Sequence, residues 1–166
     1  MTMVDLIEKD NICGGVVAMD EENHVYPIRS QYVVLACGGI GGLYQNSTNY
    51  PHIAGDGLGI AMEHQVEVEH LDYIQIHPTT LFSRSKGRRF LISESVRGEG
   101  ALLYDKNGQR FTNELQPRDI VSQAIFAQME KDGTEFVLED MRPLGEKTIR
   151  EHFPNIYQHC IEEGFD

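Results

Sequence analysis

The chain has few cysteines, and the three that it has, Cys13, Cys37 and Cys160, are far apart and odd in number. They form no C-x-x-C pair, which argues against a disulfide framework or a structural zinc site and fits a reducing compartment. No apolar run approaches the roughly 18 residues that a membrane span needs. Acidic residues near the N-terminus interrupt any stretch that would read as a signal peptide. We therefore expect a soluble, cytoplasmic protein.

Basic residues are also scarce, with 14 Lys and Arg against 26 Asp and Glu in 166 residues, for a net charge of −12. A surface this acidic repels phosphate backbones, so nucleic-acid binding is disfavoured. Eight basic and four acidic residues lie between Arg84 and Arg118, whereas the rest of the chain has six basic and 22 acidic ones. This basic island favours a site for a small anion, although its first part, residues 84–89, fits a solvated loop equally well.

Strand signals dominate the first part of the chain. Residues 12–19 and 24–28 are apolar, β-branched runs on either side of a polar turn, and they predict a hairpin. Residues 31–37 are apolar at successive positions, which is typical of a strand buried on both faces of a parallel sheet. This run leads into the glycine-rich residues 38–42, where backbone can approach a ligand closely. Further short strands are predicted at residues 90–92 and 136–138.

Helix signals follow in the second part. The strongest helix is predicted at residues 117–131, because proline stands in its first turn, apolar residues recur at helical spacing and Gly133 follows. Asn107-Gly108 between two apolar runs predicts a two-residue hairpin turn. The irregular mixture of strands and helices makes the fold class α/β running into α+β. Further helices are predicted at residues 55–64, 146–153 and 154–163.

Five short motifs occur in order along the chain. Taken together they resemble the flavoprotein family that contains L-aspartate oxidase, fumarate reductase and succinate dehydrogenase. The resemblance covers residues 12–166. It is strongest to the L-aspartate oxidase branch, because the connection from Arg97 to Arg118 is short and residues 136–166 are similar to that branch. The motifs are Leu35-Ala36-Cys37-Gly38-Gly39, Gly55-Asp56-Gly57, His77-Pro78-Thr79, Ser93-Glu94-Ser95-Val96-Arg97-Gly98-Glu99-Gly100 and Pro117-Arg118-Asp119.

The resemblance implies an internal fragment of a larger FAD-dependent oxidoreductase. Residues 1–71 would be the C-terminal part of an FAD-binding domain, and residues 72–166 the capping domain that closes over the substrate. The family's G-x-G-x-x-G fingerprint is missing, since the glycines at 38–42 do not supply it. We therefore expect that the fragment alone is inactive and does not retain FAD.

The implied reaction is the oxidation of L-aspartate to iminoaspartate, with hydride transfer to FAD and reoxidation of the flavin by oxygen or fumarate. This is the first step of NAD biosynthesis from aspartate, and quinolinate synthase is the implied partner protein. The implied substrates are small dicarboxylates, L-aspartate and fumarate. Two alternatives stay open: a soluble fumarate reductase or succinate dehydrogenase flavoprotein, and an isolated non-catalytic binding module.

The same resemblance assigns the catalytic residues. Arg118 matches the family's proton donor or acceptor, and Glu94 and Arg97 match the relay that returns protons to it. A planar guanidinium suits a carboxylate substrate because it binds through two hydrogen bonds. With a reference pKa of roughly 12.5 or higher it donates a proton easily but is a poor base, so clamping the substrate can be its main role. The i, i+3 spacing of Glu94 and Arg97 is equally typical of an ion pair within a helix.

Binding residues follow from the same motifs. His77, Ser93 and Glu94 would hold the substrate carboxylates. A lone histidine at a strand end is more often structural, and only the match favours His77. Ser93 keeps the hydroxyl donor at a position where relatives usually have threonine.

The flavin contacts are assigned in the first part of the chain. Gly38 and Gly39 would allow close approach of the backbone, and Asn49 and Asp56 would be further contacts to FAD. The Gly55-Asp56-Gly57 motif fits a helix N-cap as well. The histidines other than His77 show no metal-ligand spacing, so no metal site is expected.

Overall fold

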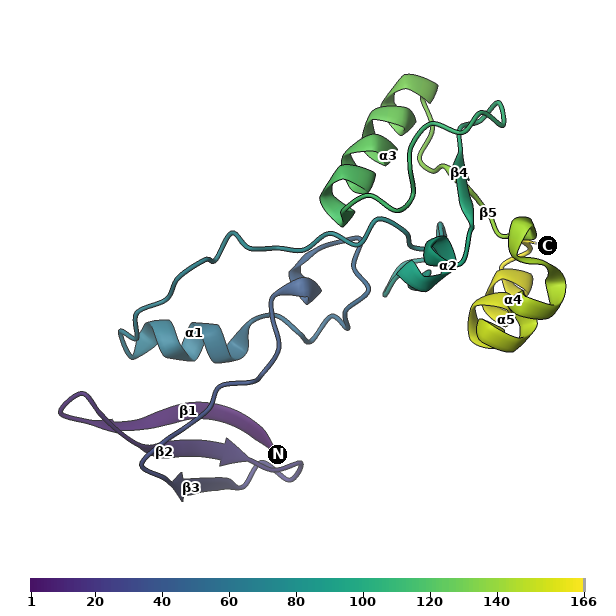
Figure 1. Cartoon of the computed structure of the whole chain (residues 1–166). Helices are drawn as coiled ribbons and strands as arrows, with labels where there is room; N and C mark the ends of the chain where they lie inside the picture. Colours follow the sequence, from purple (N-terminus) through teal and green to yellow (C-terminus); the bar gives the residue numbers. More distant parts are fainter. Residues whose placement is uncertain (166) are drawn as a thin grey trace. The chain divides into compact units, whose positions relative to one another are not determined.

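The computed structural model describes residues 1–165, which divide into two compact units, one of residues 1–73 and one from Ile74 onward. Strands and helices are mixed within the chain, as the sequence predicts (Figure 1). None of the described helices is long and apolar enough to span a lipid bilayer. In chain order the elements are β1 (Thr2–Lys9), β2 (Ile12–Met19), β3 (Val25–Arg29), η1 (Gly41–Leu43), α1 (Asp56–Glu63), α2 (Glu94–Gly98), β4 (Leu102–Tyr104), α3 (Arg118–Asp132), β5 (Leu138–Asp140), η2 (Arg142–Leu144), α4 (Glu146–His152) and α5 (Pro154–Glu162).

The first unit is built on a three-stranded antiparallel sheet in the order β1-β2-β3. The predicted hairpin is confirmed, since β2 pairs with β3 and Met19 stands opposite Val25. Asp20 stabilises the turn between them, because its carboxylate accepts hydrogen bonds from the backbone of Glu22 and His24 and from the Tyr26 hydroxyl. Strand β1 is missed by the sequence patterns, because acidic residues break its apolar alternation.

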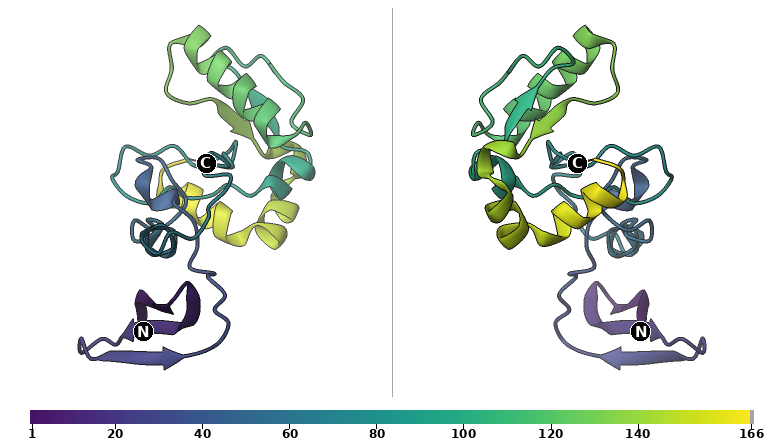
Figure 2. Two further views of the ribbon diagram at one scale, coloured as in Figure 1. Left: turned by 90° about the vertical axis from the view of Figure 1, so that its left-hand side faces the viewer. Right: turned by 90° about the vertical axis from the view of Figure 1, so that its right-hand side faces the viewer.

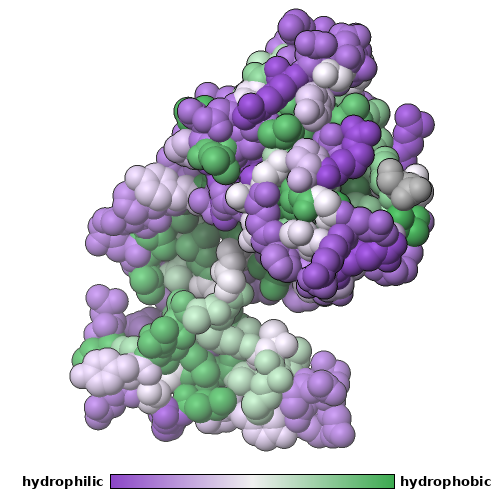
Figure 3. Space-filling view, turned by 45° about the vertical axis from the view of Figure 1, so that its right-hand side comes forward, coloured by the Kyte–Doolittle hydropathy of each residue, from purple (hydrophilic) through white to green (hydrophobic). Residues whose placement is uncertain are grey.

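The predicted buried strand at residues 31–37 is wrong. This segment contains no regular structure, and the side chains of Tyr32 and Val34 are 85% and 89% exposed. A strand needs a neighbour for its backbone hydrogen bonds, and β2 already has one on each side. The apolar run predicts that its side chains are buried, but it does not specify a strand with which its backbone could pair. Apolar side chains of the sheet also reach the surface, among them those of Ile12, Val25 and Ile28 (Figure 3).

Helix α1 packs against β1. It begins after Gly55, whose φ of 87° is a left-handed conformation that glycine adopts without strain. Gly57 and Ala61 are its buried residues. Just past the helix, the His64 ring contacts Asp5 on β1, with 2.7 Å between Nε2 and the carboxylate. This contact fixes the end of α1 on the sheet.

The second unit contains the β4–β5 pair, and α3 covers one face of it (Figure 2). Leu103 of β4 is fully buried against Val121 and Ile125 of α3. The predicted helix at 117–131 is confirmed with a shift of one residue. The helix starts after Pro117, and Gly133, which has a φ of 64°, is the C-cap that follows its last residue. Its first residue is Arg118.

A separate core in the same unit joins α2, α5 and Phe153, the residue between α4 and α5. Val96 of α2 is fully buried and packs with Ile92, Phe153 and Ile156. The helices predicted at residues 146–153 and 154–163 are confirmed as α4 and α5. The two cores thus hold α2 and α3 independently.

Three local predictions need correction in this unit. The Asn107-Gly108 turn forms, with Gly108 at a φ of 76°, but only one bridge, between Tyr104 and Arg110, closes it. Strand β4 pairs instead with β5, which starts at Leu138 and not at residue 136. The strand at residues 90–92 is reduced to the bridge between Thr80 and Leu91. For β4, a partner distant in sequence thus replaces the local one.

Candidate functional site

The short helix α2 presents two of the predicted site residues. Ser93 caps it, because its hydroxyl oxygen accepts a hydrogen bond from the backbone N–H of Ser95 at 3.3 Å. Val96 anchors the helix in its core. Glu94 and Arg97, three residues apart, therefore share one side of α2.

Glu94 and Arg118 form the central ion pair of the site. Nε and Nη2 of Arg118 both donate to Oε2 of Glu94, at 2.8 and 2.5 Å. The third contact of the guanidinium is Nη1, which donates to Oε1 of Gln75 at 2.7 Å. The side chains of Arg118 and Glu94 are 36% and 46% exposed, so the pair is accessible to a small molecule. An exposed pair adds little stability, and its main effect is to orient the guanidinium.

Arg97 points into the protein. Only 2% of it is exposed, and Nη1 donates to the backbone carbonyl of Glu114 at 2.7 Å. Its Nη2 is 3.8 Å from Oε1 of Glu94, close enough for charge attraction but too long for a hydrogen bond. Within residues 1–165, Nε and Nη2 of Arg97 have no hydrogen-bond partner. The expected Glu94–Arg97 contact is therefore purely electrostatic.

His77 reaches the same site through Thr79. The Thr79 hydroxyl donates to the Ile92 carbonyl and the Ile92 N–H donates to the Thr79 carbonyl, which fixes the His77 segment beside the start of α2. Nδ1 of His77 lies 2.9 Å from the Thr79 carbonyl oxygen and 3.2 Å from the Thr79 nitrogen. Thr79 can therefore accept from this ring nitrogen or donate to it, so either neutral tautomer has a partner.

The charges in the site act on one another. Burial lowers the pKa of His77, and the positive charges of Arg118 and Arg97 lower it further. The hydrogen bond from Arg118 holds the pKa of Glu94 below its usual range. At neutral pH His77 is therefore neutral and Glu94 ionised, which leaves the cluster with the excess positive charge of one arginine. His77, Glu94, Arg97 and Arg118 lie within range of each other's charges, as the sequence predicts.

Ser93 lies at the edge of this cluster. Its hydroxyl oxygen is engaged by the Ser95 N–H and lies 3.3 Å from the Ser95 hydroxyl. The capping contact uses only an acceptor position, and the hydroxyl proton, which Ser93 donates to the Ser95 hydroxyl, could be turned to a substrate instead. The capping role and the predicted carboxylate contact are therefore compatible.

The residues predicted to contact FAD lie in the first unit. Gly38 is exposed with a φ of 84°, and a side chain placed at the exposed Gly39 would meet nothing within 4 Å. Asp56 is exposed as the first residue of α1, and the Asn49 side chain lies against Gly41. Open backbone at two neighbouring glycines fits the close approach of a flat cofactor. The motif also forms the start of α1, with Gly55 as its N-cap, although no side chain donates or accepts a capping hydrogen bond there.

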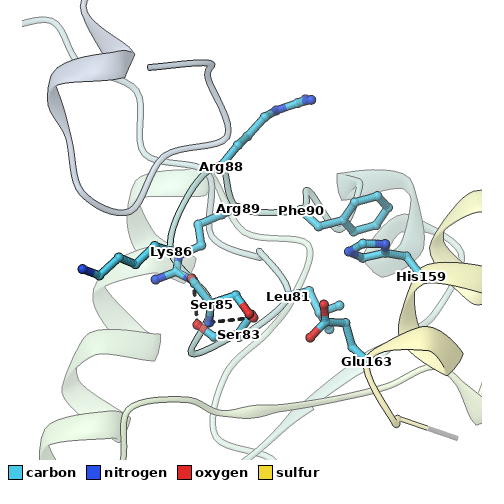
Figure 4. Close-up of a pocket in the computed structure, with 9 residues that line it drawn as sticks. All are labelled: Leu81, Ser83, Ser85, Lys86, Arg88, Arg89, Phe90, His159 and Glu163. Carbon is cyan, nitrogen blue, oxygen red and sulfur yellow. Dashed lines mark hydrogen bonds between the residues drawn. The ribbon is translucent and has the colours of Figure 1, made fainter. Parts of the chain in front are cut away.

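The basic loop at residues 84–89 borders a pocket of its own (Figure 4). Arg89 donates to the carbonyl oxygens of Ser83 and Ser85 at 2.6 and 3.0 Å, so it holds the loop together. Lys86 and Arg88 extend away from the pocket. An acidic residue, Glu163, also lines it. This arrangement favours the solvated loop over an anion site at residues 84–89.

The sequence patterns missed two residues of the site. Gln75 orients Arg118, and the backbone of Glu114 accepts from Arg97. Gln75 could have been predicted, since it is two residues from His77 and the two share a face of an extended segment. The role of Glu114 could not, because a backbone carbonyl is chemically the same at every residue.

Comparisons with known proteins agree with one family. The family model of the FAD binding domain matches residues 1–166. The chain is 45% identical over 163 residues to the L-aspartate oxidase of Clostridium acetobutylicum and 46% identical over 165 residues to that of Clostridium perfringens. These alignments cover 98% and 99% of this chain but only 37% of each relative.

Solved structures give the same picture. A variant of the E. coli quinol fumarate reductase FrdA matches with a TM-score of 0.80 and 33% identity, over 96% of this chain and 31% of that one. The open conformation of a flavocytochrome c3 fumarate reductase matches with a TM-score of 0.54 and 35% identity, over 76% of this chain and 24% of that one. The chain therefore corresponds to a minor part of the length of each protein that it matches.

Proposed function

Since this chain belongs to the FAD binding domain family, we propose that it is part of an FAD-dependent L-aspartate oxidase. The observation that carries the proposal is the cluster of His77, Glu94, Arg97 and Arg118, which has excess positive charge and an accessible guanidinium. The names of the two clostridial relatives support the choice of substrate. Residues 1–71 would belong to the FAD-binding part and residues 72–166 to a capping domain over the substrate.

The cluster suits a small dicarboxylate. Arg118 presents a planar guanidinium whose orientation Glu94 and Gln75 fix from two sides. A carboxylate of the substrate gains from this orientation because less side-chain entropy is lost on binding. When Nδ1 of His77 accepts from the Thr79 N–H, the Nε2–H group is available for the second carboxylate or its neighbour.

Proton movement in the site follows from the same contacts. Oxidation of aspartate to iminoaspartate removes a hydride from the α-carbon and a proton from the amino group. In this direction Arg118 acts as a clamp on the substrate, because a guanidinium is a poor base. Glu94 is ionised, partly exposed and hydrogen-bonded to Arg118, so it can pass protons between the site and solvent. Arg97 stabilises the ionised form of Glu94 from below the surface.

FAD would be held by Gly38, Gly39, Asn49 and Asp56. When bound, it supplies the acceptor for the hydride, and oxygen or fumarate would reoxidise it. The reaction would take place in the cytoplasm as the first step of NAD biosynthesis. Iminoaspartate hydrolyses in water, so an enzyme that consumes it promptly, quinolinate synthase, is the proposed partner.

A soluble fumarate reductase or succinate dehydrogenase flavoprotein is the second candidate. It is favoured by the guanidinium of Arg118, which could donate the proton that fumarate takes up together with the flavin's hydride and regain a proton through Glu94. The structural matches to fumarate reductases point the same way.

Anaerobic flavin reduction distinguishes the two. The full-length flavin-loaded protein should lose its yellow absorbance when L-aspartate is added, and succinate should have no such effect. If L-aspartate never bleaches the flavin, while an artificial electron donor supports fumarate reduction, the second candidate replaces the first. The product of the first reaction is identified by trapping oxaloacetate after the imine hydrolyses.

A further inference from the structure

Glu139 is a half-buried acid with one buried carboxyl oxygen, and the proposed function does not use it. It lies on β5 directly opposite Leu103 of β4. Directly opposite residues of an antiparallel pair point to the same face of the sheet. Since Leu103 is fully buried against α3, the Glu139 side chain also leaves the sheet on its covered face. Its Oε1 is buried and has no hydrogen-bond partner among residues 1–165.

Three charged or titratable groups from different elements act on Glu139. Arg97 of α2 attracts its negative charge, and Glu114, in the loop before α3, repels it. On α5, the Cys160 thiol has a pKa that burial raises and that the Glu139 charge raises further. Burial dominates at Glu139 and raises the pKa of its carboxyl to about 7. Glu139 therefore changes its charge near neutral pH.

Glu114 is already committed to other partners. Its carboxylate accepts from Arg110 at 3.1 and 2.6 Å and from the backbone N–H of Leu103 at 2.8 Å. It cannot therefore neutralise Arg97 with its side chain, and only its carbonyl serves that residue. The buried guanidinium of Arg97 is left with unused donors at Nε and Nη2, while the buried Oε1 of Glu139 is left as an unused acceptor.

We propose that Glu139 is a positioning residue for Arg97, a second carboxyl that competes with Glu94 for the same buried guanidinium and does so only when it is ionised. The inference rests on the proposed roles of Glu94 and Arg97. While Glu139 is neutral, Arg97 directs its charge toward Glu94 and supports the pair with Arg118. Once Glu139 is ionised, it attracts the same guanidinium and weakens the hold of Arg97 on Glu94.

The first test measures the ionisation of Glu139 without flavin or substrate. The 166-residue chain is labelled with ¹³C at the glutamate carboxyls and ¹⁵N at arginine Nε, and its NMR spectra are followed from about pH 5 to about pH 9. One glutamate carboxyl should titrate near pH 7, and Glu139→Gln should remove that signal. The Arg97 Nε resonance, assigned by its loss in Arg97→Lys, should shift with the same midpoint in the unmodified chain and stay constant in Glu139→Gln.

Matched variants make the result specific. Glu135→Gln makes the same change at an exposed position four residues earlier and should leave both titrations unchanged. Glu139→Leu removes the carboxyl with an apolar side chain and should behave as Glu139→Gln does. The proposal is overturned if the Glu139 carboxyl titrates at about 4.5, the usual range for glutamate. It is also overturned if the Arg97 Nε resonance does not shift when Glu139 titrates.

The second test links Glu139 to turnover. In the full-length flavin-loaded protein, kcat should fall as the pH rises through the Glu139 midpoint, and Glu139→Gln should remove this fall while KM stays unchanged. If the NMR titrations behave as expected but L-aspartate is not oxidised, the proposed function fails and the coupling between Glu139 and Arg97 stands. If turnover is present with the same pH profile in both proteins, the positioning role is refuted.

Discussion

Replacing Leu103 by alanine tests the packing that places Arg118. Leu103 is fully buried between the β4–β5 pair and the Val121 and Ile125 side chains of α3. The change removes three buried carbon atoms, at about 0.8 kcal/mol each. With a cavity contribution added, we expect a loss of about 3 to 4 kcal/mol in the free energy of unfolding of this unit.

Hydrogen exchange measures this loss where it occurs. The chain consists of two compact units, so a single unfolding midpoint would mix them, whereas amide exchange reports β4, β5 and α3 alone. Protected amides in these elements should exchange about 100-fold faster or more in Leu103→Ala. The control is Leu115→Ala, because Leu115 lies nearby in sequence but is 72% exposed. Equal effects of the two substitutions would refute the assignment of Leu103 to a core that holds α3.

Three further predictions concern the site, the cofactor and the first unit. Arg118→Lys in the full-length enzyme should lose most turnover, because an ammonium cannot make the forked contacts to Glu94 and Gln75; near-normal steady-state rates would show that Arg118 is wrongly assigned. The purified 166-residue chain should be colourless and without oxidase activity, and stoichiometric flavin in its absorbance spectrum would contradict this. The hydrogen bond between His64 and Asp5 raises the pKa of His64 and lowers that of Asp5. Its stabilising effect is therefore complete between the ordinary values of about 3.9 and about 6.5, and is lost as the pH rises through the raised His64 value or falls through the lowered Asp5 value. Protection of the α1 amides against hydrogen exchange, measured at several pH values and corrected for the intrinsic exchange rate, should show this window, and His64→Gln should flatten it; a flat profile in the unmodified chain would contradict the assignment.

Local signals predicted the elements that depend on local interactions. The helix that begins at Arg118 has its proline, its apolar spacing and its terminal glycine within one stretch of sequence. The β2–β3 hairpin is similar, since one polar turn joins two β-branched runs. Strand pairing between β4 and β5 could not be predicted, because the choice of partner depends on the whole unit. The apolar run at residues 31–37 failed for the same reason.

The contacts of the site residues also divide into those that local signals predict and those that depend on residues distant in sequence. The motifs identified Glu94, Arg97 and Arg118, and helical spacing pointed to an ion pair between Glu94 and Arg97, which the structure has at 3.8 Å. The hydrogen bonds of Glu94 are in fact made with Arg118, 24 residues away, while Arg97 turns inward to a backbone carbonyl. Spacing indicates which residues share a helix face. It does not determine which of several cations comes close enough to donate.

The Glu94–Arg118 pair joins two helices at their first residues, and each helix is anchored in a different core. Val96 anchors α2 among the residues around Phe153, whereas Val121 anchors α3 on Leu103. A small repacking in either core would move one partner of the pair relative to the other, without any change in the charged residues themselves. Apolar substitutions far from the surface are thus a route by which evolution or an engineer can change the geometry of this ion pair.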